Sequence, residues 1–176
     1  ETIRIAQNKF EMVRRWFDCG LRTDRPFLIH GEAALLSAIG RSALPLWMRA
    51  TKGAGAQGSC RVMSAEQGSA WLRFWQGNKT TWEFMLECYL PGREFAFSSL
   101  WYQGELVCSS ARERLEFVFP QHAPSGVTSS PVVARSVHNE QVNRMATQAI
   151  LAVDDAPNGI YCVDLNCDER DLPRPT

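Results

Sequence analysis

The glycine-rich stretch LPLWMRATKGAGAQGSCRV, residues 44–62, has residue types well suited to ligand binding. An apolar run containing Arg49 leads into three glycines within six residues, and a second apolar run follows. Because glycine has no Cβ, the N–H groups of such a loop can approach phosphate oxygens closely. The loop lacks the GxxxxGKS/T pattern of a P-loop and the strand–GxGxxG–helix order of a dinucleotide site. We expect either a phosphate-binding loop between two strands or an ordinary hairpin turn. Taken by itself, the glycine loop favours the hairpin turn.

Two other segments place charged side chains in strand-like runs. In SSARERLEF, Arg112 and Arg114 alternate with Glu113, so both guanidinium groups project from the same face of a strand. Such a pair suits phosphoryl oxygens or a substrate carboxylate, although an exposed face of paired charges explains the pattern as well. In YCVDLNC, Asp164 is a lone acid among apolar residues, and Asn166 faces the same way. Burying a carboxylate suggests a metal site or a hydrogen-bond network.

Composition and charge limit the classes of protein to which the chain can belong. Its 176 residues, 45% of them hydrophobic and six of them tryptophan, suffice for a buried core and argue against disorder. Nineteen basic and nineteen acidic residues cancel, which argues against non-specific binding to nucleic acid. The six cysteines form no CxxC pair, and no run approaches the ~20 apolar residues that cross a membrane. We expect a reduced, cytoplasmic protein without a membrane or nucleic-acid partner.

Hydrophobic periodicity and turn residues predict a mixed α+β chain. Helical spacing of apolar residues predicts four helices, over residues 8–20, 31–42, 64–78 and 137–153. Asn8 is expected to cap the first helix, and Ser64–Gln67 resembles a capping box at the start of the third. Apolar runs between turn residues predict strands over residues 26–30, 45–50 and 60–64. An antiparallel meander is predicted next, over residues 82–90, 94–102 and 105–119, with turns at Pro91-Gly92 and Gln103-Gly104. Residues 121–131 are expected to form a loop, and residues 159–167 the last strand.

Four segments in this order resemble the motifs of the ATP-grasp superfamily, which includes biotin carboxylase, carbamoyl-phosphate synthetase and D-alanine–D-alanine ligase. They are similar to the opening helix (NKFEMVRRWFDCGLRT), the strand and glycine loop (LWMRATKGAGAQGS), the hinge (LECYLPGREFAF) and the strand before a metal-binding turn (GIYCVDLNCDERDLP). The resemblance implies an α+β ATP-grasp fold whose two lobes of antiparallel sheet, with flanking helices, clamp the nucleotide. Residues 1–86 would form one lobe, and residues 87–176 a second lobe that is truncated at its C-terminal end.

The resemblance also assigns ATP-binding roles to the matching positions. Arg49, where the family more often has lysine, would reach the α- and β-phosphates, with Lys52 as a second charge. Backbone amides of residues 55–59 would cover the β- and γ-phosphates, and residues 88–90 would read the adenine edge. Taken alone, the same residues are also consistent with solvated charges at a strand end and on exposed faces. The implied ATP-binding set is Lys9, Arg49, Lys52, Gly55, Gln57, Gly58, Ser59, Glu87, Cys88, Tyr89, Leu90 and Glu94. Within it, Glu87 would lie near the adenine amino group and Glu94 would accept from the ribose hydroxyls.

The chemical centre implied by the resemblance contains two arginines and one acid. Arg112 and Arg114 would be catalytic and would steady the γ-phosphate as it moves. Asp164 would supply one Mg²⁺ ligand, and the glutamate and asparagine that complete the site would follow Thr176. The chain begins without methionine and stops within DERDLPRPT, so we expect adjoining domains of the same longer chain.

The implied function is that of an ATP-dependent carbon–nitrogen ligase using ATP and Mg²⁺. A small carboxylate would attack the γ-phosphate of Mg-ATP to form an acylphosphate, and an amine or similar nucleophile would then displace phosphate. Two alternatives stay open at this point. One is a non-catalytic nucleotide-binding or regulatory module of a larger protein. The other is a structural or interaction domain whose glycine loop is only a hairpin.

Overall fold

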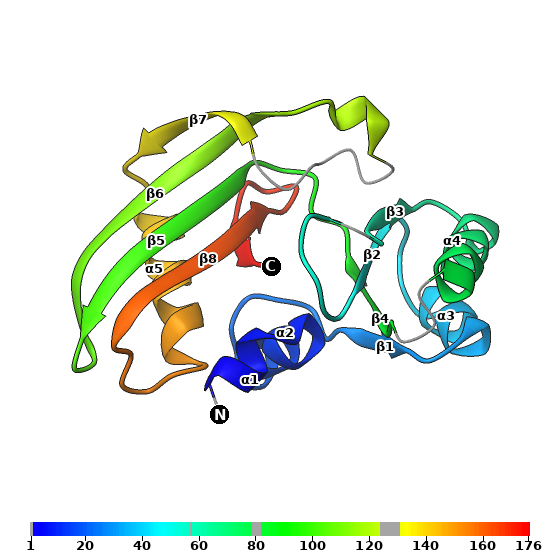
Figure 1. The fold of residues 1–176 in the computed structure, drawn as a ribbon, viewed down its shortest axis with the longest axis horizontal. Helices are drawn as coiled ribbons and strands as arrows, with labels where there is room; N and C mark the ends of the chain where they lie inside the picture. Colours follow the sequence, from blue (N-terminus) through cyan, green and yellow to red (C-terminus); the bar gives the residue numbers. More distant parts are fainter. Residues whose placement is uncertain (1, 57, 79–81, 124–130) are drawn as a thin grey trace.

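The structure, a computed structural model, describes residues 2–56, 58–78, 82–123 and 131–176. Two antiparallel sheets lie side by side, a four-stranded sheet with strand order β1-β4-β2-β3 and a five-stranded sheet with order β7-β6-β5-β8-β9. In Figure 1 the five-stranded sheet lies on the left and the four-stranded sheet on the right, with the C-terminus between them. This arrangement confirms the α+β class with two antiparallel sheets and flanking helices.

The four-stranded sheet carries the glycine loop. It consists of β1 (Phe27–Ile29), β2 (Leu46–Ala50), β3 (Cys60–Val62) and β4 (Phe84–Cys88). Two helices, α3 (Glu32–Ile39) and α4 (Ala65–Asn78), pack against the sheet and share its apolar core with it. β2 and β3 pair as an antiparallel hairpin with Met48 opposite Cys60, so the loop connects neighbouring strands as predicted.

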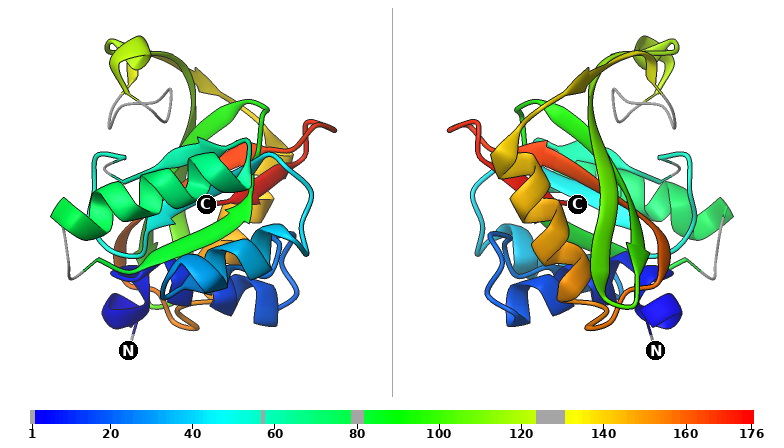
Figure 2. Two further views of the ribbon diagram at one scale, coloured as in Figure 1. Left: turned by 90° about the vertical axis from the view of Figure 1, so that its right-hand side faces the viewer. Right: turned by 90° about the vertical axis from the view of Figure 1, so that its left-hand side faces the viewer.

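The five-stranded sheet carries the remaining charged candidates. It consists of β5 (Glu94–Tyr102), β6 (Glu105–Phe117), β7 (Pro131–Val137), β8 (Gly159–Cys167) and β9 (Pro173–Pro175). Figure 2 shows α5 (Glu140–Leu151) lying across one face of this sheet. α2 (Lys9–Asp18) joins the same core through Val13 and Trp16. The indole N–H of Trp16 donates to the carbonyl of Ala149 at 2.9 Å, which fixes α2 against α5.

Three of the helices begin at side chains that satisfy their first N–H groups. Asn8 accepts hydrogen bonds from the N–H groups at the start of α2, as predicted, and Asn139 does the same for α5. At α4, the Ser64 hydroxyl accepts from the N–H of Gln67 at 3.2 Å, and the Gln67 side chain accepts from the N–H of Met63 at 2.7 Å. The Ser64–Gln67 pair therefore forms the predicted reciprocal cap, although its return bond goes to the residue before the cap.

The predicted meander is wrong in its first strand. β4 pairs with β1 and β2 in the four-stranded sheet, so it is not a neighbour of β5. Residues 89–93 instead carry the chain from one sheet to the other. The predicted domain boundary between residues 86 and 87 falls inside β4, and the division into two domains stays a prediction.

Four short elements escaped the sequence-based prediction, one of them the 3₁₀ helix η1 (Pro120–His122). β7 occupies much of the region between the expected loop and α5, which begins at Glu140 rather than at residue 137. Most of its side chains are exposed, because it is an edge strand, and so it shows no buried period. β9 follows the strand expected to be last, and its two prolines are tolerated at the sheet edge. The fourth element, α1 (Thr2–Ala6), has no buried residue.

Candidate nucleotide site

A cleft of about 490 Å³ lies between the two sheets, a size typical of small-ligand sites. It is lined by the start of α2, the glycine loop, the segment that joins the sheets, and the adjacent ends of β5, β6, β8 and β9. Eleven of the predicted site residues line it: Lys9, Arg49, Gly55, Ser59, Glu87, Cys88, Tyr89, Leu90, Glu94, Arg114 and Asp164. Lys52, Gly58 and Arg112 are outside this lining, and Gln57 lies outside the described residues.

Arg49 and Glu87 form an ion pair at the floor of the cleft. The Nε of Arg49 lies 2.8 Å from Oε1 of Glu87, and their side chains are only 12% and 13% exposed. Burial raises the pKa of Glu87, and the Arg49 charge beside it opposes that rise. Nη2 of Arg49 is buried and has no hydrogen-bond partner in the described part of the chain. The strand-end arginine is therefore not a solvated charge, and it keeps a donor that a ligand anion could use.

Lys9 holds the entry to the glycine loop. Its ammonium group donates to the carbonyl of Gly53 at 2.6 Å, and its backbone N–H donates to the carbonyl of Thr51 at 2.8 Å. Burial, followed by the Arg49 charge, lowers the pKa of Lys9. Gly53 and Gly55 have φ of +102° and +73°, which a side chain would disfavour. Lys9, which the resemblance places in the ATP-binding set, thus contacts loop backbone, and the Arg49 charge contributes to lowering its pKa.

The open face of the five-stranded sheet brings three charged groups together. Glu94 pairs across the strands with Arg114, and Nη2 of Arg114 lies 2.6 Å from Oδ1 of Asp164. The side chain of Asp164 is 51% exposed, so the sequence argument from a buried carboxylate is wrong for this residue. Burial raises the pKa of Glu94, with the Arg114 charge opposing it. Arg112 lies on the same face, two residues along β6, and is exposed.

The segment that joins the sheets forms one end of the cleft. The Tyr89 ring lies 6.1 Å from the Trp47 ring, and the Arg61 guanidinium sits 5.2 Å above the same tyrosine. Burial, together with the nearby Asp24 carboxylate, raises the pKa of the Cys88 thiol to about 11. This thiol is therefore protonated at neutral pH and acts in the cleft wall as a neutral group.

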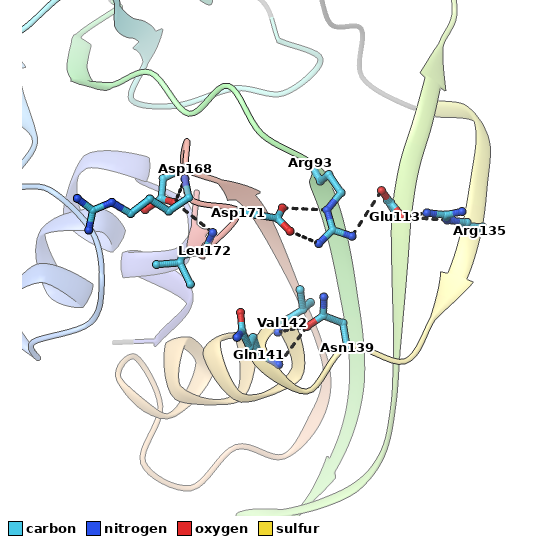
Figure 3. Close-up of polar contacts among 10 residues, drawn as sticks. Arg93, Glu113, Arg135, Asn139, Gln141, Val142, Asp168, Asp171 and Leu172 are labelled. Carbon is cyan, nitrogen blue, oxygen red and sulfur yellow. Dashed lines mark hydrogen bonds and ion pairs between the residues drawn. The ribbon is translucent and has the colours of Figure 1, made fainter.

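A chain of charges fixes the exit of this joining segment (Figure 3). Arg93 donates two hydrogen bonds to the Asp171 carboxylate, at 2.9 and 2.5 Å. On its other side it lies 3.9 Å from Glu113, whose buried carboxylate also pairs with Arg135 at 2.7 Å. A Cβ at Gly92 would come 2.7 Å from the carbonyl oxygen of Cys167, so only glycine fits this approach. The predicted Pro91-Gly92 turn is thus docked on the end of β8.

The structure adds residues that sequence reasoning did not assign. Arg174 lines the cleft from β9 and binds the Asp24 carboxylate at 2.7 Å and the Asp168 carboxylate at 3.2 Å. Trp47, Thr23 and Thr176 also line it. No local pattern marks Arg174, because it lies between two prolines in a segment that reads as a turn. Only the pairing of β9 with β8 brings it to the cleft.

The charges that line the cleft balance, with four basic and four acidic side chains: Lys9, Arg49, Arg114, Arg174, Asp24, Glu87, Glu94 and Asp164. Each arginine is already held by a carboxylate. A polyanion that enters the cleft would therefore meet guanidinium donors whose positions are fixed by neighbouring carboxylates. A divalent cation bound with it would neutralise the negative charge of those carboxylates.

The metal-binding capacity of the cleft is limited. The described residues include no group of three or more His, Cys, Asp or Glu side chains that could hold a metal ion. Mg²⁺ is commonly bound through one or two carboxylates together with substrate phosphates. Asp164 and Asn166 both line the cleft from β8 and face the same way, so they fit a cation that arrives with a nucleotide.

Comparisons with known proteins agree with this geometry. No protein-family model matches the sequence, and no curated protein matches it. Among solved structures, a carboxyaminoimidazole ribonucleotide synthase from Aspergillus clavatus complexed with ATP matches with a TM-score of 0.77 at 17% identity, over 99% of this chain and 44% of that chain. D-cycloserine synthetase DcsG matches with a TM-score of 0.75 at 17% identity, over 98% of this chain and 61% of that one. An L-amino acid ligase from Bacillus licheniformis matches with a TM-score of 0.71 at 18% identity, over 99% and 40%.

These matches concern the fold. At such identities they show shared architecture, and the architecture confirms the fold that the four sequence motifs predicted. The chain spans less than two thirds of the length of each of these proteins. Among the described helices, none is long and apolar enough to cross a membrane, and the six cysteines are all free thiols.

Proposed function

We propose that this chain, which has the ATP-grasp fold, is the ATP-binding region of an ATP-dependent carboxylate–amine ligase. The observation that carries the proposal is the convergence of four separate segments on one cleft. These are the start of α2, the glycine loop after β2, residues 87–90 at the end of β4 and the start of the joining segment, and the charged face of β5, β6 and β8. The motif resemblance lies in the first three of these segments and in β5 and β8 of the fourth. In this proposal residues 1–86 and 87–176 are the two lobes, and adjoining domains of a longer cytoplasmic protein supply the rest.

The cleft lining combines charged side chains, glycine-loop backbone and the aromatic rings of Trp47 and Tyr89, which suits a nucleoside triphosphate. The glycine loop, Arg49 and Arg114 would bind the phosphates, since guanidinium groups and glycine N–H groups both favour phosphate oxygens. The backbone of residues 88–90 would bind the adenine edge beside Trp47 and Tyr89. Glu94, at the start of β5, would accept from the ribose hydroxyls.

The structure changes three roles that the motifs implied. Glu87 is held by Arg49, so its first task is to orient that guanidinium rather than to contact the adenine amino group. Lys9 positions the loop entry through Gly53, and its reach to phosphate is secondary. Lys52 and Gly58 would act around the loop, since neither lines the cleft.

The proposed chemistry depends on positioning and charge neutralisation. A substrate carboxylate oxygen would attack the γ-phosphorus, the bond to the β,γ-bridging oxygen would break, and ADP would leave with that electron pair. An amine would then attack the acylphosphate carbonyl and release phosphate. Arg114, with Arg112 beside it on β6, would stabilise the charge on the transferred group. Bound Mg²⁺, held by Asp164 and Asn166, would supply further neutralisation of the phosphates.

One observation favours the second candidate, a nucleotide-binding module without turnover. Position 49 holds arginine instead of the family's usual lysine, and its forked, planar group is already engaged by Glu87. A guanidinium fixed in this way can bind a phosphate group in the ground state but cannot move with that group as the transfer proceeds.

Calorimetric titration with Mg-ATP, followed by an ADP-release assay with a panel of carboxylates and amines, tests the proposal. Arg114→Met should weaken ATP binding about tenfold or more, because a hydrogen bond to a charged group contributes about 1.5–3 kcal/mol. Arg73→Met is the matched control, since this exposed arginine of α4 is outside the cleft lining. Absence of ATP binding to the unmodified chain would refute both candidates. ATP binding without ADP release from the full-length protein would favour the non-catalytic module.

A further inference from the structure

The exit of the glycine loop rests on a group of aromatic side chains from α4, from β4 and from Trp82 just before β4. Gly58 has φ of +75°, and a Cβ there would come 3.0 Å from the Trp82 ring and 3.2 Å from the Phe84 ring. Its carbonyl oxygen accepts a hydrogen bond from the indole N–H of Trp71 at 2.9 Å. Ser59, the next residue, is buried and lines the cleft. The backbone at this point is therefore held both by packing and by one side-chain donor.

The entry of the loop is held in a corresponding way. Lys9 donates to the carbonyl of Gly53 at 2.6 Å, so each end of the loop has one carbonyl bound by a side chain from a helix. Gly53, Ala54, Gly55 and Ala56, which follow the first anchor, line the cleft. Fixing both ends of a short glycine-containing segment reduces the number of conformations it can adopt before a ligand binds. The entropic cost of ordering the loop on binding is therefore smaller.

Trp75 lies one turn further along α4 and, in the described part of the chain, makes no hydrogen bond like the one from Trp71 to the Gly58 carbonyl, which we call the anchor of the loop. The two indoles are in edge contact with ring centroids 5.8 Å apart, and Trp75 stacks on Trp82 at 5.0 Å. The indole nitrogen of Trp75 is buried and has no hydrogen-bond partner among the residues that the structure describes. The same helix thus presents two tryptophans in one cluster, of which one anchors the loop and the other only packs.

We propose that Trp71 is a positioning residue for the nucleotide site, which holds the glycine loop in its binding conformation through the Gly58 carbonyl. This inference rests on the proposed ATP-binding function and adds a residue outside the cleft lining to it. Trp71 acts only through the loop. Its bond sets the direction of the Gly58–Ser59 peptide, whose N–H donates to the Ala56 carbonyl at 3.1 Å, so it holds the last turn of the loop beside the cleft-lining Ser59.

The test compares Trp71→Phe with Trp75→Phe in the full chain. Each variant keeps an aromatic ring in the cluster, and only the first removes a hydrogen bond. Trp71→Phe should speed hydrogen exchange of the amides of residues 53–59 without nucleotide and should raise the Kd for Mg-ATP about two- to tenfold. Trp75→Phe should leave loop exchange and the Kd at their original values. Thermal unfolding should show a larger decrease for Trp71→Phe, because only that variant loses a hydrogen bond.

The outcomes separate this inference from the proposed function. If the unmodified chain does not bind Mg-ATP, the proposed function fails, while loop exchange still tests the anchor. If the unmodified chain binds Mg-ATP and both variants behave alike in exchange and affinity, the anchoring role of Trp71 is overturned. If Trp71→Phe does not fold, the indole proton of Trp71 in the unmodified chain decides by NMR. Slow exchange with solvent, slowed further by Mg-ATP, supports the anchor, and no response to Mg-ATP overturns it.

Discussion

Removing Arg49 should destabilise the fold in a pH-dependent way, because the change leaves Glu87 without its partner. Both side chains are nearly buried, at 12% and 13% exposure, and their charged atoms lie 2.8 Å apart. Breaking a buried pair from one side costs about 3–5 kcal/mol, and the residual exposure favours the lower end. We therefore expect Arg49→Met to lose about 3 kcal/mol of unfolding free energy near neutral pH. For a chain of this length, that loss corresponds to a decrease of about 6–12 °C in the melting temperature.

The sign of the pH dependence follows from Glu87. Burial raises its pKa above the ordinary 4.5, and Arg49 opposes the rise, so Arg49→Met should raise the pKa further. A raised pKa means that the native state holds the proton more tightly than the unfolded chain does. Stability then falls as pH rises from 4.5 through the folded-state pKa. The deficit of Arg49→Met should therefore be larger at about pH 8 than at about pH 5.

Urea unfolding of three variants at both pH values is the assay. The double variant Arg49→Met/Glu87→Leu should recover most of the loss, since it removes both charges together. Arg73→Met, which breaks an exposed pair with Glu32, should lose less than about 1 kcal/mol at either pH. An equal deficit for Arg49→Met at both pH values, or a double variant no more stable than the single one, would refute this reasoning.

Substitutions at four further positions test other parts of the structure by unfolding experiments. The hydrogen bonds from Arg93 lower the pKa of Asp171, so this pair contributes stability above pH 3.8 that is lost as pH falls through the folded-state pKa. Asp171→Asn should flatten that acid limb, and an unchanged limb would contradict the assignment. Gly58→Ala should lower the free energy of unfolding by about 1–2 kcal/mol, because Gly58 has a positive φ and close aromatic neighbours. Gly77→Ala, at an exposed position of α4, should raise the free energy of unfolding by at most about 1 kcal/mol. Ser64→Ala should remove about 1 kcal/mol through loss of the α4 cap, and Ser64→Asp should restore it.

Local signals in the sequence predicted the elements that hold the site. The Asn8 cap, the Ser64–Gln67 cap and the glycine hairpin were all readable from neighbouring residues, and the structure contains each of them. What failed were pairings between distant strands. Nothing in WEFMLECYL shows that β4 inserts between β1 and β2, because its apolar run suits either sheet.

The site shows the same division between local and distant information. Convergence on one cleft followed from the order of motifs, but the partner of each charge did not. Glu87 and Asp164 were assigned to ligands, whereas in the structure they first bind Arg49 and Arg114. Arg174 was missed because its importance depends on an edge strand enclosed by prolines. Charge partners across a sheet depend on register, which a single sequence specifies only where a buried face fixes it.

The most direct test of the central claim is a crystal structure of the chain with Mg²⁺ and a non-hydrolysable ATP analogue. We expect the triphosphate between the glycine loop and the open face of β5, β6 and β8, within hydrogen-bond distance of Arg49 or Arg114. We expect the base beside residues 88–90. An analogue bound elsewhere, or one whose phosphates lie at the Tyr89 end of the cleft, would contradict the account.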